Sequence, residues 1–423
     1  MSLVEKEVTL KNVEQARNNP EFERRQETEQ KLIPVNPEIF TWLYKESGEK
    51  VVQGYLSNPE DEFSLRFRQI GTGESARYAA TLKDRGEIVH GALKRTEIDT
   101  EISAESFKYF EQMELPIVEK IRTEIMDGVT VDFYDDPETP VVVEIEHADP
   151  QERTRILAVL EDIAGPLIDK SDSPELTTEA IAHRIHAKRN PEISLKTPES
   201  LDAFTDRVVA EMIAQYVSGK NHVVIALDGM PGSGKTTVTR GAQERIVEAI
   251  GEQYKPVIVS TDDYHFGKKA LEEQYGAPYT EWDDAKTYNT AELAAHLELH
   301  SKGIPLIKRH FDFESEEPVL DEELAVSPFV IVEGLYAGSS DLDKVRDSYF
   351  ELPTSIATSI GRDVRRLVIE NRANRVFPTP ESRLRYQMEV ALPLHLEKER
   401  PKRKAFSASV RPMGERAFML AQL

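Results

Sequence analysis

The sequence predicts a multidomain protein, with an N-terminal antiparallel β-barrel and a C-terminal α/β domain that has a doubly wound parallel sheet. The N-terminal part repeatedly alternates charged and apolar residues, which is the period of a β-strand. The C-terminal part alternates short apolar runs with helical segments, which is typical of a parallel sheet covered on both faces. We place the first domain at residues 1–165, a linker with one helix at 166–200, and the second domain at 201–423.

The composition is that of a globular protein without disulfides. Its 423 residues are 30% charged and 39% apolar, enough for two or three cores. The absence of cysteine excludes disulfides and thiolate metal ligands, and it fits a cytoplasmic protein. No apolar run reaches membrane-spanning length, so we expect no membrane partner. The net charge of −23 argues against nucleic acid as a partner, so any phosphate site must concentrate the basic residues.

The N-terminal strands carry their charges on one face. Residues 27–31 place Glu27, Glu29 and Lys31 at alternate positions, and the pattern returns in later segments. These segments are 65–68, 78–83, 95–99, 120–122, 131–134 and 143–146. One interpretation is a sheet with a solvated face, the usual meaning of alternation. The other is a closed barrel whose lumen offers carboxylates to a hard cation and basic residues to phosphate. Carboxylates that lie two residues apart favour the closed barrel, although the residues alone leave both interpretations open.

The ordered set of segments resembles the CYTH family, the triphosphate tunnel metalloenzymes. The signature is Glu27-x-Glu29-x-Lys31, and the resemblance covers about residues 25–150. It implies an eight-stranded antiparallel tunnel that binds a triphosphate together with Mg²⁺ or Mn²⁺. The implied metal ligands are Glu27, Glu29, Glu144 and Glu146, the first two also being counted as catalytic. The implied phosphate ligands are Lys31, Arg66, Arg68, Lys83, Arg95, Lys120 and Arg122. Asp99 stands where the family usually has Glu.

The resemblance leaves the reaction of the tunnel open. Family members cleave inorganic triphosphate, thiamine triphosphate or RNA ends, cyclise ATP, or only bind polyphosphate. A metal ion in such a site neutralises phosphate oxygens and activates water for in-line attack. Since nothing in the sequence predicts an RNA surface, we expect a small inorganic or organic triphosphate.

Helices are predicted around the join between the two domains. Residues 149–163 place Ile156, Leu157, Leu160 and Ile163 on one stripe, which predicts a helix that caps the first domain. A second helix is predicted near residues 177–188. A third at 201–217 is expected to brace the second domain.

The second domain begins with a phosphate-binding loop at residues 229–236 (GMPGSGKT). It lies between a predicted strand at 222–227 and a predicted helix at 237–250. Glycines let backbone N–H groups approach phosphate oxygens, and the positive end of the helix faces the anion. We expect Lys235 to contact the β- and γ-phosphates of ATP and Thr236 to ligate Mg²⁺. The expected nucleotide-binding set is Gly229, Gly232, Ser233, Gly234, Lys235, Thr236 and Thr237.

Two more apolar runs, 256–260 and 329–332, are followed by acidic residues. The carboxyl ends of parallel strands meet at the ligand edge of such a sheet. These strand ends resemble the uridine kinase and phosphoribulokinase family over about residues 220–400. The resemblance implies phosphoryl transfer in which Asp262 orients or deprotonates the acceptor hydroxyl and Glu333 holds Mg²⁺ through water or contacts the acceptor. Lys235 completes the catalytic set.

The acceptor side departs from that family. Segments 282–285 and 310–313 match less well, with Ala285 in place of a Pro, and Asn289 stands in place of an Asp. The resemblance implies a lid that closes over the phosphates, formed by Arg362, Arg365, Arg366, Arg372 and Arg375. Of these arginines, Arg362, Arg366 and Arg372 are expected to bind the nucleotide. A solvated helix face is the alternative for these arginines.

Three functions follow from the sequence. The first is a bifunctional enzyme, an ATP-dependent kinase of a small, nucleoside-like acceptor fused to a tunnel that binds or hydrolyses triphosphate. The second has all the activity in the tunnel, as a triphosphatase or pyrophosphatase, with the phosphate-loop domain as a nucleotide-gated regulator. The third is a polyphosphate-binding scaffold without catalysis. Small molecules are the expected partners, and a homodimer is left open.

Overall fold

The computed structural model describes residues 26–190, 199–312, 315–369 and 377–397. Within these ranges the chain forms two compact units. The barrel unit contains residues up to 190 together with segment 363–389, and the P-loop unit contains residues 199–362 and those from 390 onward. Residues 1–25 and 398–423 lie outside the described residues.

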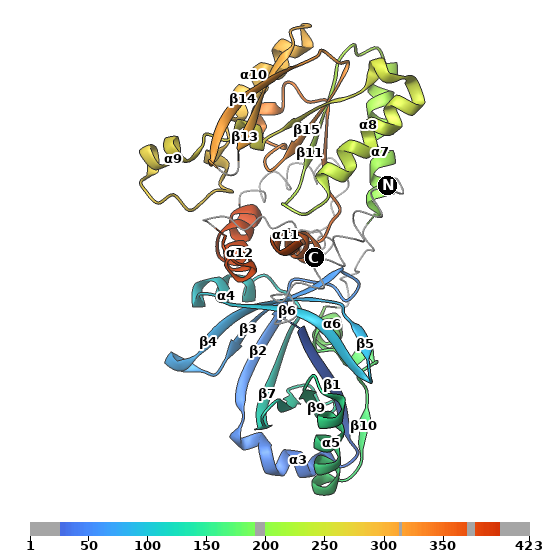
Figure 1. The fold of residues 1–423 in the computed structure, drawn as a ribbon, viewed down its shortest axis with the longest axis vertical. Coiled ribbons are helices and arrows are strands. Elements are labelled where there is room, and N and C mark those ends of the chain that lie inside the picture. Colours follow the sequence, from blue (N-terminus) through green and yellow to red (C-terminus); the bar gives the residue numbers. More distant parts are fainter. Residues whose placement is uncertain (1–25, 191–198, 313–314, 370–376, 398–423) are drawn as a thin grey trace. The chain divides into compact units, whose positions relative to one another are not determined.

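An eight-stranded antiparallel barrel forms the barrel unit, as predicted (Figure 1). Its strands are β1 (Gln26–Pro34), β2 (Glu49–Tyr55), β3 (Phe63–Ile70), β4 (Arg77–Asp84), β6 (Ala92–Glu101), β7 (Ile117–Met126), β8 (Val129–Tyr134) and β9 (Val142–Glu146). They follow the order β1-β9-β8-β7-β2-β3-β4-β6, and β6 pairs with β1 to close the ring. The short strands β5 (Glu87–Val89) and β10 (Leu167–Asp169) pair with β6 and β1. The closed barrel, one of the two interpretations left open by the alternation, is therefore the observed one.

Helices cover the outside of the barrel. They are α3 (Pro37–Tyr44), α4 (Ala104–Glu111), α5 (Pro150–Ala164) and α6 (Thr178–Arg189). Helix α5 begins at the cap Asp149, whose side chain accepts from the Gln151 N–H, and ends at Gly165. Its Ile156 and Leu160 pack into a core with strand residues, and burying each such side chain stabilises the fold by about 1.5–3 kcal/mol. Ile163, predicted on the same stripe, is instead 48% exposed.

Residues predicted as linker pack against the barrel. Strand β10 pairs with β1, and Ile181 and Ile185 of α6 pack with Tyr55 and Val118. The division between the compact units falls after residue 190, near the end of the segment 166–200 that was predicted as linker.

A four-stranded parallel sheet forms the centre of the P-loop unit, also as predicted. The strand order is β12 (Val257–Ser260), β15 (Phe329–Gly334), β11 (Val223–Asp228) and β16 (Ser348–Glu351). On one face, Ile225 and Leu227 pack with α7 (Leu201–Val217) and α8 (Lys235–Ile250). On the other face, Val224 and Ala226 pack with α10 (Thr290–Ser301). Helices on both faces make the sheet doubly wound.

Further elements of the P-loop unit follow the central strands. They are α9 (Lys268–Tyr275) and the antiparallel hairpin of β13 (Leu306–Asp312) and β14 (Glu317–Leu324). None of the helices in the described ranges has the length and apolar character needed to span a lipid bilayer.

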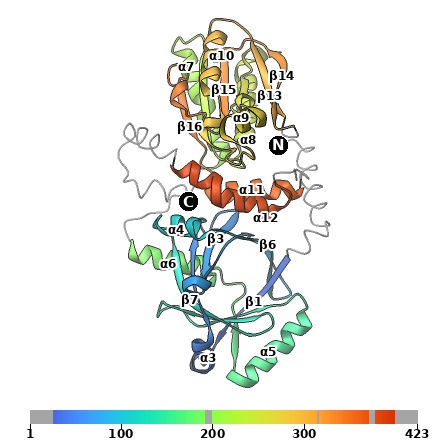
Figure 2. The same cartoon turned by 90° about the vertical axis from the view of Figure 1, so that its left-hand side faces the viewer.

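The chain passes between the two units within α11 (Ile356–Ile369) and returns after Glu389. In the barrel unit, α12 (Pro380–Tyr386) packs against β6 and β4 (Figure 2). The Asp363 carboxylate accepts from Arg383 Nε and Gln387 Nε2, both at 2.7 Å, and so joins α11 to α12. A π-helical turn, Gln387–Ala391, continues the chain from there.

Candidate functional sites

The barrel brings the predicted phosphate ligands and carboxylates into one network of ion pairs. Glu27 on β1 faces two neighbouring strands, with Lys83 Nζ at 2.8 Å and Arg95 Nε at 2.9 Å from its Oε2. Lys31 Nζ lies 2.9 Å from Glu29 and 3.4 Å from Glu144. Because residues two apart on one strand share a face, the alternation in sequence places these groups together.

On the far side of this network, β7 and β8 contribute a buried cluster. The Asp132 carboxylate is fully buried between Lys120 Nζ at 2.5 Å and Arg122 Nη2 at 2.6 Å. Arg122 also contacts Glu144 at 2.5 Å. Burial and the charge of Arg122 lower the pKa of Lys120 to about 8, whereas Arg122, Lys31 and Lys120 overcome the effect of burial and hold the pKa of Glu144 well below its usual range.

Two arginines on β3 have incompletely satisfied donors. Arg66 and Arg68 each place Nη2 3.4 Å from a carboxylate of β6, Glu97 and Asp99 respectively. The Nε atoms of both arginines are buried without a hydrogen-bond partner. Burial and the neighbouring charge of Arg66 lower the pKa of Arg68 to about 10. A buried donor without an acceptor is costly, so these arginines are prepared to bind an anion.

The carboxylates at the end of β9 form the part of the network most suited to a cation. Reduced solvation and the charges of Glu144 and Glu27 raise the pKa of Glu146 to about 7, although this side chain keeps contact with solvent. Crowded carboxylates of this kind fit a divalent cation with oxygen ligands. Over the described ranges, no three potential ligand side chains are gathered on a metal position, since Glu27, Glu29 and Glu144 contact basic residues instead.

The phosphate-binding loop has the predicted strand–loop–helix setting. It links β11 to α8, and Gly232 and Gly234 have φ of 81° and 98°, values that favour glycine. Lys235 Nζ donates to the carbonyl oxygens of Gly229 at 2.8 Å and Met230 at 3.1 Å, so it lies over the loop. Ser233 Oγ is buried without a partner. Thr236 and Thr237 are exposed at the start of the helix, where an anion and its metal can reach them.

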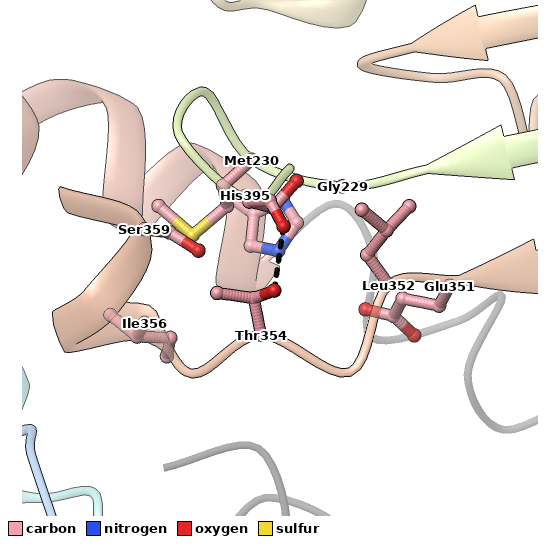
Figure 3. A pocket seen from close by; sticks show the side chains of 9 residues that line it. Gly229, Met230, Glu351, Leu352, Thr354, Ile356, Ser359 and His395 are labelled. Carbon is pink, nitrogen blue, oxygen red and sulfur yellow. Dashed lines mark hydrogen bonds between the residues drawn. The ribbon is translucent and has the colours of Figure 1, made fainter. Parts of the chain in front are cut away.

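A pocket borders the loop (Figure 3). Gly229, Met230 and Ser233 line one side, and residues after β16 line another. Thr354 Oγ1 donates to the Ser233 carbonyl at 2.6 Å and ties the loop to the end of β16. His395 also lines this pocket.

The predicted acids lie at the carboxyl ends of neighbouring strands. The Thr261 N–H donates to the Glu333 carbonyl at 2.8 Å, which holds the end of β12 beside that of β15. Burial and the charge of Glu333 raise the pKa of Asp262 to about 7, and Lys235 partly opposes this rise. A carboxyl with such a pKa can accept a proton from an acceptor hydroxyl near neutral pH.

Two acids that the sequence analysis left without a role lie in this region. Asp283 is one of the charges that raise the pKa of Asp262, and its carbonyl accepts from the Tyr336 hydroxyl at 2.6 Å. Asp228 is buried, and its Oδ2 accepts from the Gly338 N–H at 2.9 Å, which fixes the loop after β15. For Asp228 the available signal was its strand-end position, since it ends β11 directly before Gly229, whereas Asp283 lies in a loop and gave no such signal.

An aromatic group follows Asp262 in the chain. His265 stacks on Trp282 with ring centroids 5.8 Å apart and has Tyr288 at 5.3 Å and Phe311 at 4.8 Å. Burial lowers the pKa of His265 to about 4, so the ring is neutral at pH 7. Asn289, which departs from the family pattern, caps α10 by accepting from the Glu292 N–H at 3.1 Å.

The predicted lid arginines are divided between the units. Arg362 ends the first stretch of the P-loop unit, whereas Arg365 and Arg366 belong to the barrel unit. Arg365 Nη1 lies 3.6 Å from Glu62 Oε1. Arg372, Arg375 and Phe313 of segment 310–313 lie outside the described residues.

Comparisons with solved structures find partial likenesses to both kinds of protein that the sequence resembles. A proposed fructose transport system kinase of Silicibacter sp. TM1040 is 18% identical, with 47% of this chain and 95% of that chain covered at a TM-score of 0.39. A proposed uridine kinase of Bacillus stearothermophilus is 16% identical, with 34% and 79% covered at 0.28. A proposed adenylyl cyclase of Hippeastrum, reported to have a dominant triphosphatase activity, is 12% identical, with 37% and 95% covered at 0.30.

No protein-family model matches the chain, and no curated protein matches it.

Proposed function

We propose that the chain is a bifunctional phosphate-handling enzyme. The P-loop unit transfers a phosphoryl group from ATP to a small, nucleoside-like acceptor, and the tunnel binds and hydrolyses a triphosphate with Mg²⁺ or Mn²⁺. Two separate observations support the proposal: a glycine loop at a helix N-terminus, which suits a phosphate, and two lumen arginines whose buried Nε donors lack acceptors.

The kinase half is supported by the placement of Asp262. Its pKa near 7 lets it take the proton of the acceptor hydroxyl, while Lys235 neutralises charge on the phosphates. Glu333 and Thr236 would hold Mg²⁺, which would neutralise charge on the phosphates. The aromatic group around His265, three residues after Asp262, supports an acceptor that carries a ring.

The tunnel half is supported by the charge balance of the lumen. Every predicted phosphate ligand in the lumen has a carboxylate within 4 Å. A triphosphate that binds these basic residues would therefore replace the carboxylates as their partners. The released Glu27, Glu29 and Glu144 would then be available, together with Glu146, to a divalent cation, which would stabilise the charge on the phosphates.

The test is a screen for phosphate release and ATP consumption with Mg²⁺ or Mn²⁺. The substrates are triphosphate, pyrophosphate, nucleoside triphosphates and candidate acceptors, each with the wild type, Lys235→Ala, and Glu27→Ala with Glu29→Ala. We expect Lys235→Ala to abolish acceptor-dependent ATP consumption alone and the glutamate pair to abolish triphosphate hydrolysis alone.

Other outcomes would separate the remaining functions. Triphosphate hydrolysis without acceptor-dependent ATP use for any acceptor would favour a tunnel enzyme with a regulatory P-loop unit. Turnover of neither ATP nor triphosphate would leave a polyphosphate-binding scaffold.

A further inference from the structure

Strand β6 carries two sets of residues that face different parts of the barrel unit. Arg95, Glu97 and Asp99 enter the ion-pair network of the lumen. At the end of the same strand, Thr100 and Glu101 contact α12, where Arg385 Nε donates to the Glu101 carbonyl at 2.9 Å and to Thr100 Oγ1 at 3.3 Å. The lumen and α12 are thus joined by a single strand.

A second contact fixes the end of the same segment. The Ser103 N–H, two residues after β6, donates to Glu389 Oε1 at 2.6 Å. Both anchors lie within the barrel unit, although Arg385 and Glu389 are contributed by the C-terminal part of the chain. Segment 363–389 is covalently continuous with the P-loop unit at both of its ends.

The carboxylates on the lumen side of β6 are paired with basic residues that a polyanion would also bind. In this structure the β6 carboxylates Glu97 and Asp99 lie 3.4 Å from Arg66 and Arg68 respectively, which are long distances for ion pairs. An entering polyanion competes for these arginines, whose Nε donors still need an acceptor. Asp99 would then lose its ion pair with Arg68. Because Asp99 directly precedes Thr100, the lumen with and without a polyanion would differ next to the contact that Thr100 and Glu101 make with Arg385 of α12.

We propose that α12 and its anchors couple the tunnel to the nucleotide site, so that polyanion bound in the lumen changes the affinity of the P-loop unit for ATP. The proposal rests on the proposed function, because it takes the tunnel as a triphosphate site and the loop as an ATP site. Linkage requires the effect to be reciprocal, so ATP changes the affinity for triphosphate by the same factor.

The experiment measures the two dissociation constants of the full chain by calorimetry with Mg²⁺. Inorganic triphosphate is titrated with and without a saturating non-hydrolysable ATP analogue, and the analogue with and without triphosphate. We expect each ligand to change the dissociation constant of the other by at least about fivefold, at the low end of ordinary coupling. Independent binding, within a factor of two, would overturn the proposal.

Variants of the anchors test whether α12 carries the effect. Arg385→Ala and, separately, Glu389→Ala are expected to reduce the coupling to below twofold while each ligand alone binds as in the wild type. Arg155→Ala is the matched control, since Arg155 pairs with Glu152 on α5, an exposed contact away from β6. Undiminished coupling in both anchor variants, with wild-type melting temperatures, would contradict the role of α12.

The two proposals fail differently. If either ligand alone does not bind, the assignment of that site is wrong and the coupling falls with it. If both bind but independently, the sites stand and only the coupling is refuted.

Discussion

Asp262 is a half-buried carboxyl whose pKa of about 7 lies well above the ordinary value of 3.8. Between these values the folded protein binds a proton there that the unfolded chain has released, so this group makes stability fall as the pH rises. The Asp262→Asn variant does not titrate. We therefore expect it to be more stable than the wild type at pH 8, by at most about 4 kcal/mol, with a gain that disappears near pH 4.

Denaturant unfolding of both proteins from pH 4 to pH 8 measures this difference. Asp341→Asn is a control in the same unit, because the Asp341 carboxylate accepts from the Thr290 hydroxyl and lies away from Asp262 in the sequence. A gain that did not depend on pH would show that the Asp262 carboxyl is not the cause. The Asp262→Asn variant, unlike the control, is also expected to lose acceptor-dependent ATP consumption.

Arg68 is the residue in the tunnel that we expect to contribute most clearly to anion binding. Its Nε lacks an acceptor, and its charge is destabilised by burial and by Arg66. A charge-assisted hydrogen bond contributes about 1.5–3 kcal/mol, so Arg68→Ala should weaken triphosphate binding by roughly 10- to 100-fold. The free energy of unfolding without ligand should change little, since the pair with Asp99 is long.

Calorimetric titration with triphosphate and Mg²⁺ measures this loss. Arg77→Ala is a suitable control, because Arg77 pairs with Glu49 where both side chains are exposed. Equal affinities of Arg68→Ala and the wild type would remove Arg68 from the binding site.

At the scale of single residues, the sequence predicts the proximity of side chains on one strand better than that of side chains brought together from separate loops. Glu27, Glu29 and Lys31 could be placed together because their spacing determines a common face. Asp283 could not be placed beside Asp262, because their proximity depends on a loop whose path has no period. In the part of the chain that the structure describes, Glu27, Glu29 and Glu144 are paired with basic side chains and do not gather around a metal position, which their spacing in the sequence could not predict.

At the scale of elements, the close contact of β15 with β12 depends on Gly334. A Cβ there would lie 1.9 Å from Thr261 Oγ1, and the φ of 138° is one that glycine adopts. We expect Gly334→Ala to destabilise the P-loop unit by several kcal/mol and to displace Glu333 from Asp262, because both clash and backbone strain act. Thermal unfolding and ATP binding measure the two effects.

Gly276→Ala provides the control for backbone strain alone. Gly276 has a φ of 95° in the same unit, and a Cβ there meets no atom within 4 Å. We expect it to cost only about 1 kcal/mol. Equal costs for the two variants would mean that the contact with Thr261 is unimportant.

Most elements followed from their periodicity, and the exceptions have a common physical reason. Helix α7 has the predicted ends, and the barrel strands lie where charges alternate. The hairpin of β13 and β14 was missed because its strands pair chiefly with each other and lack a clean apolar face. The packing of α6 on Tyr55 and Val118 is a contact between distant segments, and local patterns carry no information on it.

At the scale of the whole molecule, the two anion sites should stabilise the two units separately. A ligand at 100 times its dissociation constant stabilises the unit that binds it by about 2.7 kcal/mol. We expect Mg²⁺-triphosphate to raise the melting temperature of the barrel unit, and an ATP analogue to raise that of the P-loop unit. Scanning calorimetry measures both shifts.

The loop variant Lys235→Ala separates the two shifts. It should lose the response to the ATP analogue and keep the response to triphosphate, since Lys235 lies in the phosphate loop only. Loss of both responses would mean that a single site binds both ligands.

The way the chain passes between its units also limits how the protein can be divided. A gene cut after residue 194 would yield a barrel without α12, the helix that lies on β4 and β6, and would leave that helix attached to the other product. The barrel fragment would therefore be an incomplete unit, and the other fragment would carry α12 without the strands on which it packs. The same constraint applies to evolution: in its present form, this chain could not exchange its barrel with another protein by a single recombination event at the boundary.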